Sequence, residues 1–585
     1  MAQVSSLGGA HSAHIEVDVA KPLGELLRPW TTFGYDELNW TYTPRGKRAL
    51  HSFASFAERP YYVRAHNLLT SGRAFSWPHW GSGNVYHEDA AGNPYYDWTT
   101  VDLVFDAYRE AGFKPVVELG FTPRALVPDG MDAELPFTRS PSQYGPYEAY
   151  QWSLPPRDFG KWQELMFQLA QHCVERYGAE EVTTWYWELW NEPDVAYWRG
   201  TVGHYCDLYD HTVNGLTRAL PSIKVGGPAV TGGERAVRFM ESFLAHCAGR
   251  GTRLDFITFH TKGSAFGRRY DPLSDDGAVF SWGGDVEGKG RVDVPRQSPS
   301  RKKMLTEIRA HLRAAARYPQ LRDVPCIVDE CDPCVPAHFS RYDNANFGFR
   351  NTAYYPTIMA SVFKRLMDLN ECLPDAPDVT LATAWAFYFE GERFFEGFRE
   401  FFTAENVELP ILNGYRLLGK LGNTRLALTS DASWDIARLD DLPGPGEETG
   451  VLADREVDGL AAHDGETVSV AIWHHADDQY ATEPAADVTL TVRNAPFSTQ
   501  GAGVRHWRID SQRSNAFCAW QEMGRPQDPT PDQLAALKAR QGLEEGDPVH
   551  VEPDGEGGLR LRLQLPLHAL SLLEITPPTS LAGGA

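Results

Sequence analysis

Short apolar runs alternate with helical periodicity over the first four hundred or so residues of the chain. Eight of these runs have the length and the β-branched or aromatic content of buried strands. They lie at residues 30–36, 61–67, 114–120, 183–190, 222–227, 254–260, 324–330 and 380–387. Because helical segments separate them, the pattern predicts an α/β fold, with a (β/α)8 TIM barrel over residues 30–430.

Two of the intervening helices can be delimited from the sequence. After Asp158, apolar residues recur at steps of three and four as far as Tyr177. Asp158 is a suitable N-cap and Gly178 a suitable C-terminal stop. A second helix is predicted over residues 206–221, where Pro221 ends it. Both apolar stripes are typical of helices that pack against a sheet.

Beyond about residue 430 the pattern changes to short strands without helical spacers. These strands lie at residues 459–465, 466–475, 487–494, 503–510, 559–566 and 570–577. The pattern predicts a C-terminal β-sandwich over residues 431–585, with one helical insertion at 530–544. An early strand, 14–19, lies within the segment 1–29 that precedes the barrel, and we expect it to join the sandwich.

Charge limits the partners of the chain. It has 55 basic and 78 acidic residues, a formal net charge of −23, which repels phosphate backbones and anionic lipid. We therefore expect no nucleic-acid or membrane partner. The N-terminus lacks the basic and apolar regions of a signal peptide, and the longest apolar run, 379–389, is too short to span a bilayer. These features favour a cytoplasmic location.

The chain has eight cysteines, two of which, Cys331 and Cys334, have CxxC spacing. A zinc site needs a second pair of ligands, and none follows at a suitable spacing. We interpret the pair as buried structural thiols, and we expect neither a metal nor another cofactor.

Chargeable side chains stand where several predicted strands end, which is where barrel enzymes place their active sites. Glu192 follows the strand at 183–190, and Glu330 ends the strand at 324–330. Glycoside hydrolysis needs two carboxylates at one rim, because one protonates the leaving oxygen while the other attacks or activates water. Taken alone, Glu192 could simply belong to a turn that Pro193 closes, and Glu330 could belong to a solvated pair with Asp329. Together they indicate a glycosidase.

A second glutamate, Glu188, precedes Glu192 on the same segment. On one continuous strand the two would point the same way, with Glu188 about 13 Å deeper in the barrel. A carboxylate at that depth needs a partner. We predict that Glu188 is a buried carboxylate paired with Arg64, and that Glu192 is the acid.

The chain resembles glycoside hydrolase family 39, which contains β-xylosidases and α-L-iduronidases, over nearly its whole length. The resemblance rests on segments such as "YVRAHNLL", "PPRDFGKW", "WELWNEPDV", "LDFITFHTKG" and "VDECDP". It implies a retaining double displacement with Glu192 as general acid/base and Glu330 as nucleophile. It also implies that His66, Asn191 and His260 contact the bound sugar. Glu390, at the end of the last predicted strand, is a further candidate substrate contact.

The resemblance favours a β-xylosidase that acts on xylo-oligosaccharides. Two segments, "DECDP" and "FHTKG", are more similar to the iduronidase branch, which makes Lys262 either a uronate contact or a solvated loop lysine. An α-L-iduronidase-like or α-L-arabinofuranosidase activity therefore stays open. From another class, a non-catalytic carbohydrate-binding barrel also stays open, although such a protein needs aromatic platforms and not two rim carboxylates.

Three long segments follow strands at the expected catalytic rim: 69–98, 121–157 and 261–300. Loops of this length are usually functional or disordered. We predict that they wall the cleft into a pocket for a terminal sugar, which would make the enzyme exo-acting. The alternative is that they form subunit contacts in a homo-oligomer.

Overall fold

The structure is a computed structural model. It describes residues 11–71, 81–128, 151–266, 296–335, 340–342, 344–385, 393–442, 455–497 and 500–578.

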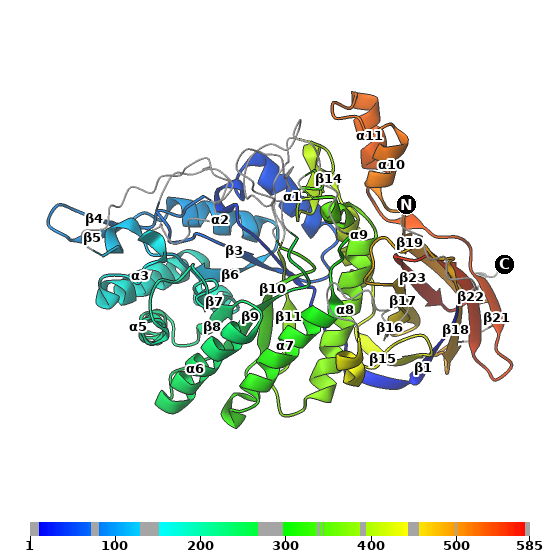
Figure 1. The fold of residues 1–585 in the computed structure, drawn as a ribbon, viewed down its shortest axis with the longest axis horizontal. Coiled ribbons are helices and arrows are strands. Elements are labelled where there is room, and N and C mark those ends of the chain that lie inside the picture. The colour runs from blue at the N-terminus through cyan, green and yellow to red at the C-terminus, as the bar shows by residue number, and fades with distance from the viewer. Residues whose placement is uncertain are drawn as a thin grey trace, which may run out of the picture.

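Nine parallel strands form a nearly closed barrel (Figure 1). They are β2 (Thr32–Tyr35), β3 (Tyr62–Ala65), β6 (Lys114–Leu119), β7 (Tyr186–Leu189), β8 (Lys224–Val230), β9 (Phe256–Lys262), β10 (Cys326–Asp332), β11 (Val379–Ala382) and β12 (Ala384–Trp385). All eight predicted strands are present, because β11 and β12 are two parts of the last one. β11 pairs with β10 and β12 pairs with β2, so the ring closes across Thr383.

Helices follow most of the strands and cover the outside of the barrel (Figure 1). They are α1 (Pro44–Ala54), α2 (Thr99–Glu110), α3 (Phe159–Tyr177), α4 (Ala179–Val182), α5 (Val202–Ala219), α6 (Glu234–Arg250), α7 (Arg301–Ala315), α8 (Tyr354–Cys372) and α9 (Pro410–Gly419). Two short antiparallel hairpins, β4–β5 (Tyr86–Glu88, Pro94–Tyr96) and β13–β14 (Phe402–Thr403, Val407–Glu408), lie outside the barrel sheet.

The helix ends follow capping chemistry. The Asp158 side chain accepts from the Lys161 amide at 3.0 Å, and Gly178 ends α3 with a φ of 87°, as predicted. The helix predicted at 206–221 instead begins at Val202. Its start is fixed by Thr201, whose hydroxyl accepts from the His204 amide at 3.0 Å while the His204 ring accepts from the Thr201 amide.

A ten-stranded sheet stands beside the barrel (Figure 1). Its strands are β1 (Ser12–Glu25), β15 (Thr424–Ser430), β16 (Glu456–Asp464), β17 (Thr467–His475), β18 (Ala486–Arg493), β19 (Gly503–Ile509), β20 (Glu544–Glu545), β21 (His550–Pro553), β22 (Leu559–Leu565) and β23 (Ala569–Thr576). The predicted strand 14–19 does lie in this sheet, since β1 pairs with β15 and β18. β15 also belongs to it, although its residues fall within the range 30–430 expected for the barrel.

Two helices, α10 (Ala516–Glu522) and α11 (Pro531–Ala539), are inserted between strands of this sheet, and α11 confirms the helical insertion predicted at 530–544. One hydrophobic core joins the barrel, its helices and one face of the ten-stranded sheet, where Leu460, Trp473 and Leu570 contribute to it. β1, β18 and β22 contribute to a separate core. Among the described helices, none has the length and apolar character needed to cross a membrane.

Candidate active site

Glu192 stands at the rim because the chain turns sharply after β7. The strand ends at Leu189, and Trp190 and Glu192 both adopt left-handed backbone conformations, with φ of 72° and 46°. The Glu192 amide donates to the Ala229 carbonyl at 2.8 Å, which fixes the turn against the next strand. The alternation of a continuous strand therefore does not extend from Glu188 to Glu192. The Glu192 side chain remains 18% exposed, whereas Glu330 is buried.

Three side chains, from the carboxyl ends of β7, β9 and β10, converge at this rim. One oxygen each of Glu192 and Glu330 and a ring nitrogen of His260 all lie within 4.8 Å of one another. His260 Nδ1 lies 2.9 Å from Oε1 of Glu192. Retaining glycosidases hold their two carboxyl groups about 5–5.5 Å apart, whereas inverting enzymes leave room for a water between them. The close approach of the pair suits the retaining reaction.

Glu330 is surrounded by positive charge. Lys262 Nζ lies 2.6 Å from its Oε2, and Arg64 Nη1 and His66 Nε2 each lie 3.4 Å from its Oε1. Burial alone would raise the pKa of Glu330, but Lys262, His260 and His66 hold that pKa well below its ordinary value. The side chain is therefore a carboxylate at neutral pH, which is the form that a nucleophile needs.

His66 is itself held between carboxylates. Nδ1 bonds to Glu118, and Nε2 lies 3.2 Å from Oδ1 of Asp36. Burial lowers the pKa of His66, but Glu118 and Asp36 outweigh it and raise the pKa to about 9. The ring lies 4.4 Å from the Trp385 ring. His66 thus faces Glu330 as an imidazolium on a rigid support.

Arg64 joins the floor of the barrel to the rim. Its Nε lies 2.6 Å from Oε2 of Glu188, which confirms the predicted pair. Its Nη2 donates to Oδ1 of the Asn191 side-chain amide at 3.1 Å. Because that oxygen is used, the Asn191 amide presents its N–H donors to other groups.

Lys262 is the last residue of β9 and is only 13% exposed, so the solvated-loop interpretation is wrong. Besides Glu330, it contacts Asp332, whose Oδ2 also accepts from Arg399 at 2.7 Å. Glu390 lies outside the described residues. So do 72–80, 129–150 and 267–295, parts of the three segments expected to wall the cleft.

Several charged residues of the site, Asp332 among them, were not predicted from the sequence. Glu118 and Asp36 stand at the ends of β6 and β2, so the strand-end criterion that found Glu330 would have found them too. Arg399 lies in an irregular segment after β12, where no periodic pattern marks a partner for Asp332.

The ligand atoms of Glu192, His260 and Glu330 lie close enough together to surround a cation. The Lys262 ammonium already contacts the Glu330 carboxylate at 2.6 Å. Burial opposes a charge on His260, but Glu330 and Asp329 raise its pKa to about 10, so the charged ring offers no lone pair. The three residues therefore do not fit a metal ion. All eight cysteines are free, and burial raises the pKa of the Cys334 thiol to about 11, as suits a structural residue.

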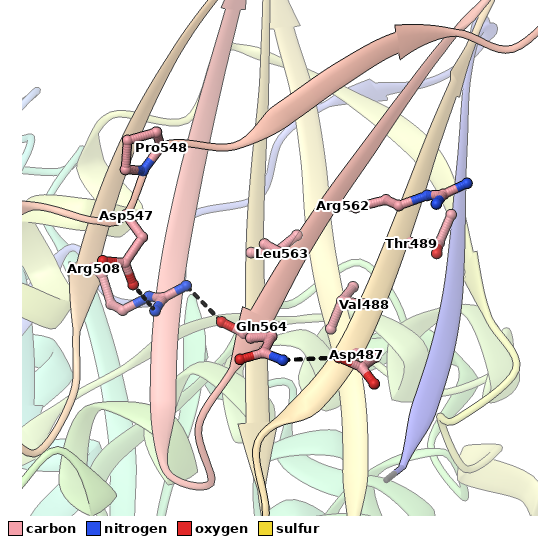
Figure 2. Close-up of a pocket in the computed structure, with 9 residues that line it drawn as sticks. All are labelled: Asp487, Val488, Thr489, Arg508, Asp547, Pro548, Arg562, Leu563 and Gln564. Atoms are coloured by element: carbon pink, nitrogen blue, oxygen red, sulfur yellow. Dashed lines mark hydrogen bonds and ion pairs between the residues drawn. The ribbon is translucent and has the colours of Figure 1, made fainter.

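The ten-stranded sheet carries a separate pocket of about 620 Å³ (Figure 2). Arg508 crosses it and donates to Asp547 at 3.2 Å and to the Gln564 carbonyl at 2.7 Å. The nine lining residues include no aromatic side chain on which a sugar ring would stack. The pocket shares no residue with the barrel site.

Comparison with known proteins connects this site with carbohydrate chemistry. The model of the family "Glycosyl hydrolases family 39" matches residues 14–271 and 296–556. A β-xylosidase from Geobacillus stearothermophilus is 23% identical over 533 residues, which cover 88% of this chain and 86% of that protein. An α-L-iduronidase from Mus musculus is 24% identical over 595 residues, which cover 96% of this chain and 80% of that protein.

Solved structures share the fold. A monomeric β-xylosidase from Caulobacter crescentus CB15 matches with a TM-score of 0.67 at 20% identity, over 96% of this chain and 99% of that one. A bacterial orthologue of human α-L-iduronidase matches with a TM-score of 0.71 at 20% identity, over 98% of this chain and 85% of that one. Because the family model spans most of the sequence, the protein is a glycoside hydrolase and belongs to glycosyl hydrolase family 39.

Proposed function

We propose that the protein is a retaining exo-glycosidase, specifically a β-xylosidase that removes terminal xylose from xylo-oligosaccharides. One observation carries the mechanism: Glu192 and Glu330 approach within 4.8 Å at one rim, and the pKa of the buried Glu330 is held well below its ordinary value. The anion and the more exposed acid stand in the places of a nucleophile and a proton donor.

The reaction proceeds in two displacements. Glu330 attacks the anomeric carbon while Glu192 gives its proton to the departing oxygen, which leaves a covalent glycosyl-enzyme. Glu192 then takes a proton from water, and the resulting oxygen nucleophile attacks the same carbon and releases Glu330. The proposed contacts to the bound sugar are His66, Asn191, His260, Lys262 and Glu390.

The charge balance of the described site favours a neutral sugar. Lys262 already faces Glu330 and Asp332, and Arg399 also contacts Asp332. The carboxylate of a uronic acid would have to compete with Glu330 and Asp332 for Lys262. The position of Lys262 supports the alternative of an α-L-iduronidase-like activity, because a lysine that contacts iduronate would also lie beside the nucleophile. An α-L-arabinofuranosidase would use the same contacts.

We extend the proposal to the rest of the molecule. Residues 1–29 and 431–585 form an accessory β-sandwich that contains most of the ten-stranded sheet. The separate hydrophobic core of this sheet supports the proposal. The rim segments 69–98, 121–157 and 261–300 close the cleft into a pocket for a terminal sugar. Rapid release of internal oligomers from a long xylan would contradict the exo-acting proposal.

The sugar is identified with a panel of aryl glycosides of xylose, arabinose and iduronic acid, with the product anomers followed in time. The xyloside should be cleaved fastest, with retained anomeric configuration. Product of inverted configuration would contradict the mechanism. No turnover of any glycoside would favour the carbohydrate-binding alternative.

The roles of the two glutamates are tested by rescue with azide. Glu330→Ala should abolish turnover, and azide should restore it with a glycosyl azide of inverted configuration, because azide enters the face that Glu330 occupied. Glu192→Ala should instead give the azide of retained configuration. The opposite assignment of the two products would exchange the roles.

A further inference from the structure

Both ring nitrogens of His260 face carboxylates. Nδ1 lies 2.9 Å from Oε1 of Glu192 and 3.7 Å from Oε2 of Glu330, and Nε2 lies 3.3 Å from Oδ2 of Asp329. A neutral imidazole has one donor and one lone pair, so one nitrogen would present its lone pair to an anion. The arrangement is satisfied when the ring donates from both nitrogens. Burial opposes that charge, but Glu330 and Asp329 raise the pKa of His260 to about 10.

Asp329 is the anion behind this ring. Its side chain is 1% exposed, and its Oδ2 lies 3.5 Å from Nη2 of Arg64. Although burial opposes it, His260 and Arg64 hold the pKa of Asp329 below its ordinary value. Burial raises the pKa of the nearby Glu188 well above its ordinary value. Of these two carboxyls, Glu188 is therefore the one that takes up a proton first, and Asp329 keeps its charge.

The remaining titratable groups near His260 do not replace Asp329. His311 of α7 acts on the same ring, but burial lowers its pKa to about 4, so it is neutral at neutral pH. Lys262 contacts Glu330 on that residue's Oε2. Of the described residues, only Asp329 accepts a hydrogen bond from Nε2 of His260, at 3.3 Å.

We propose that Asp329 is a positioning residue that acts on Glu192 through His260, an inference that rests on the acid/base role proposed above for Glu192. Because Asp329 accepts from Nε2, the ring keeps its Nδ1–H directed at Oε1 of Glu192. The transferable proton is then confined to the other carboxyl oxygen, Oε2. That proton passes to the glycosidic oxygen as the carbon–oxygen bond breaks, while His260 retains both of its own.

The first test is Asp329→Asn. Arg64 Nη2 faces the Oδ2 position as a donor, so the amide oxygen of the variant should occupy it and accept from Nε2. The ring then loses one of the two anions that keep it charged. Its neutral form offers Nδ1 as an acceptor and draws the Glu192 proton toward Oε1. The value of kcat/KM should fall about tenfold to hundredfold on phenyl glycosides, which need protonation of the leaving group. Dinitrophenyl glycosides, whose phenolate leaves unaided, should be nearly unaffected. An equal fall on both substrates would overturn the inference.

Two further variants separate the possible failures. Asp255→Asn removes a carboxylate just before β9, at the opposite end of the barrel, where Asp255 accepts from the Val225 amide at 2.8 Å. It should leave the leaving-group dependence unchanged. Glu192→Gln should show a steeper dependence than Asp329→Asn. If Glu192→Gln shows no dependence on the leaving group, the proposed acid/base role of Glu192 fails. If Glu192→Gln shows that dependence and Asp329→Asn does not, the inference about Asp329 fails.

A spectroscopic measurement needs no folded Asp329 variant. In the wild-type protein with nitrogen-15 histidine, His260 should give two ring N–H signals at pH 8, and both should vanish in His260→Gln. A single ring N–H signal for His260 would overturn the inference.

Discussion

At the residue scale, the site depends on a nucleophile whose charge is maintained by one close lysine. Lys262 is the largest favourable influence on the low pKa of Glu330, at 2.6 Å, with His260 and His66 adding to it. The amount of positive charge in contact with a buried carboxylate therefore sets the pH range in which it can attack.

Lys262→Met should raise the pKa of Glu330, because it removes a cation that stabilises the carboxylate. Glu330 then ionises at higher pH, so the acidic limb of the kcat/KM profile should move to higher pH. At the optimum, kcat/KM should fall about hundredfold, the loss seen when one preorganised donor is removed. The pH dependence of aryl glycoside hydrolysis measures both effects.

Lys302→Met is the matched control, since Lys302 lies on α7 and bonds to the Asp440 and Leu442 carbonyls. It should leave the profile unchanged. A Lys262 variant with an unshifted acidic limb would contradict the electrostatic role. A loss confined to iduronides would show instead that Lys262 serves a substrate carboxylate, whereas an equal loss on xylosides would exclude that role.

The residues of the site could be predicted as far as they follow strand ends. Glu192, Glu330, His66 and His260 all lie at or next to the carboxyl end of a strand, so hydrophobic patterning places them at one rim. Patterning did not show that Lys262 is buried against Glu330, because burial at a rim depends on the loops that cover it. Pairings such as Arg399 with Asp332 join segments with no common period, so no local signal reveals them.

At the element scale, strand positions could be read from the sequence more reliably than the conformations at their ends. All eight barrel strands were found, yet β7 ends at Leu189 and two left-handed residues follow, which apolar periodicity does not indicate. The start of α5 was likewise missed, because its capping box uses His204 where glutamate or glutamine is usual. The end of an element depends on a few specific hydrogen bonds.

The cap of α3 gives a test at this scale. Asp158→Ala should lower the free energy of unfolding by about 1 kcal/mol, because the Lys161 amide at the helix start loses its acceptor. The denaturant midpoint measures the change, and kcat should stay the same because the cap lies outside the site. Asp158→Ser keeps an acceptor and should restore most of the loss. Equal destabilisation by both variants would mean that the cap is not its source.

At the scale of the whole molecule, buried charges join the barrel to the ten-stranded sheet. Glu456 of β16 lies 2.6 Å from Nη1 of Arg301 on α7 and 2.9 Å from Nη2 of Arg365 on α8. Trp473 also donates to Glu456 at 3.0 Å. Patterning predicts strands in both parts of the chain, but not this contact, because charged residues on a helix and a distant strand carry no sign of their partner.

Glu456→Gln should therefore destabilise the contact between the barrel and the ten-stranded sheet. The neutral amide removes one anion from each of two buried arginines, although Asp477 stays beside Arg301 and Asp458 beside Arg365. Because these partners remain, the loss should not exceed about 3 kcal/mol, the lower end of the cost of breaking a buried ion pair. Burial would raise the pKa of Glu456, but Arg301 and Arg365 hold it far below its ordinary value of 4.5. A lowered pKa stabilises the folded state above the ordinary value and loses that contribution as the pH falls toward the folded value. The difference in thermal unfolding between wild type and variant should thus be full at pH 7 and shrink below about pH 4.5.

Glu466→Gln, at an exposed turn of the same sheet, is the control and should change neither the thermal unfolding nor its pH dependence. A difference that stays constant from pH 7 to pH 3 would show that shape, and not the charge of Glu456, holds the sheet to the barrel.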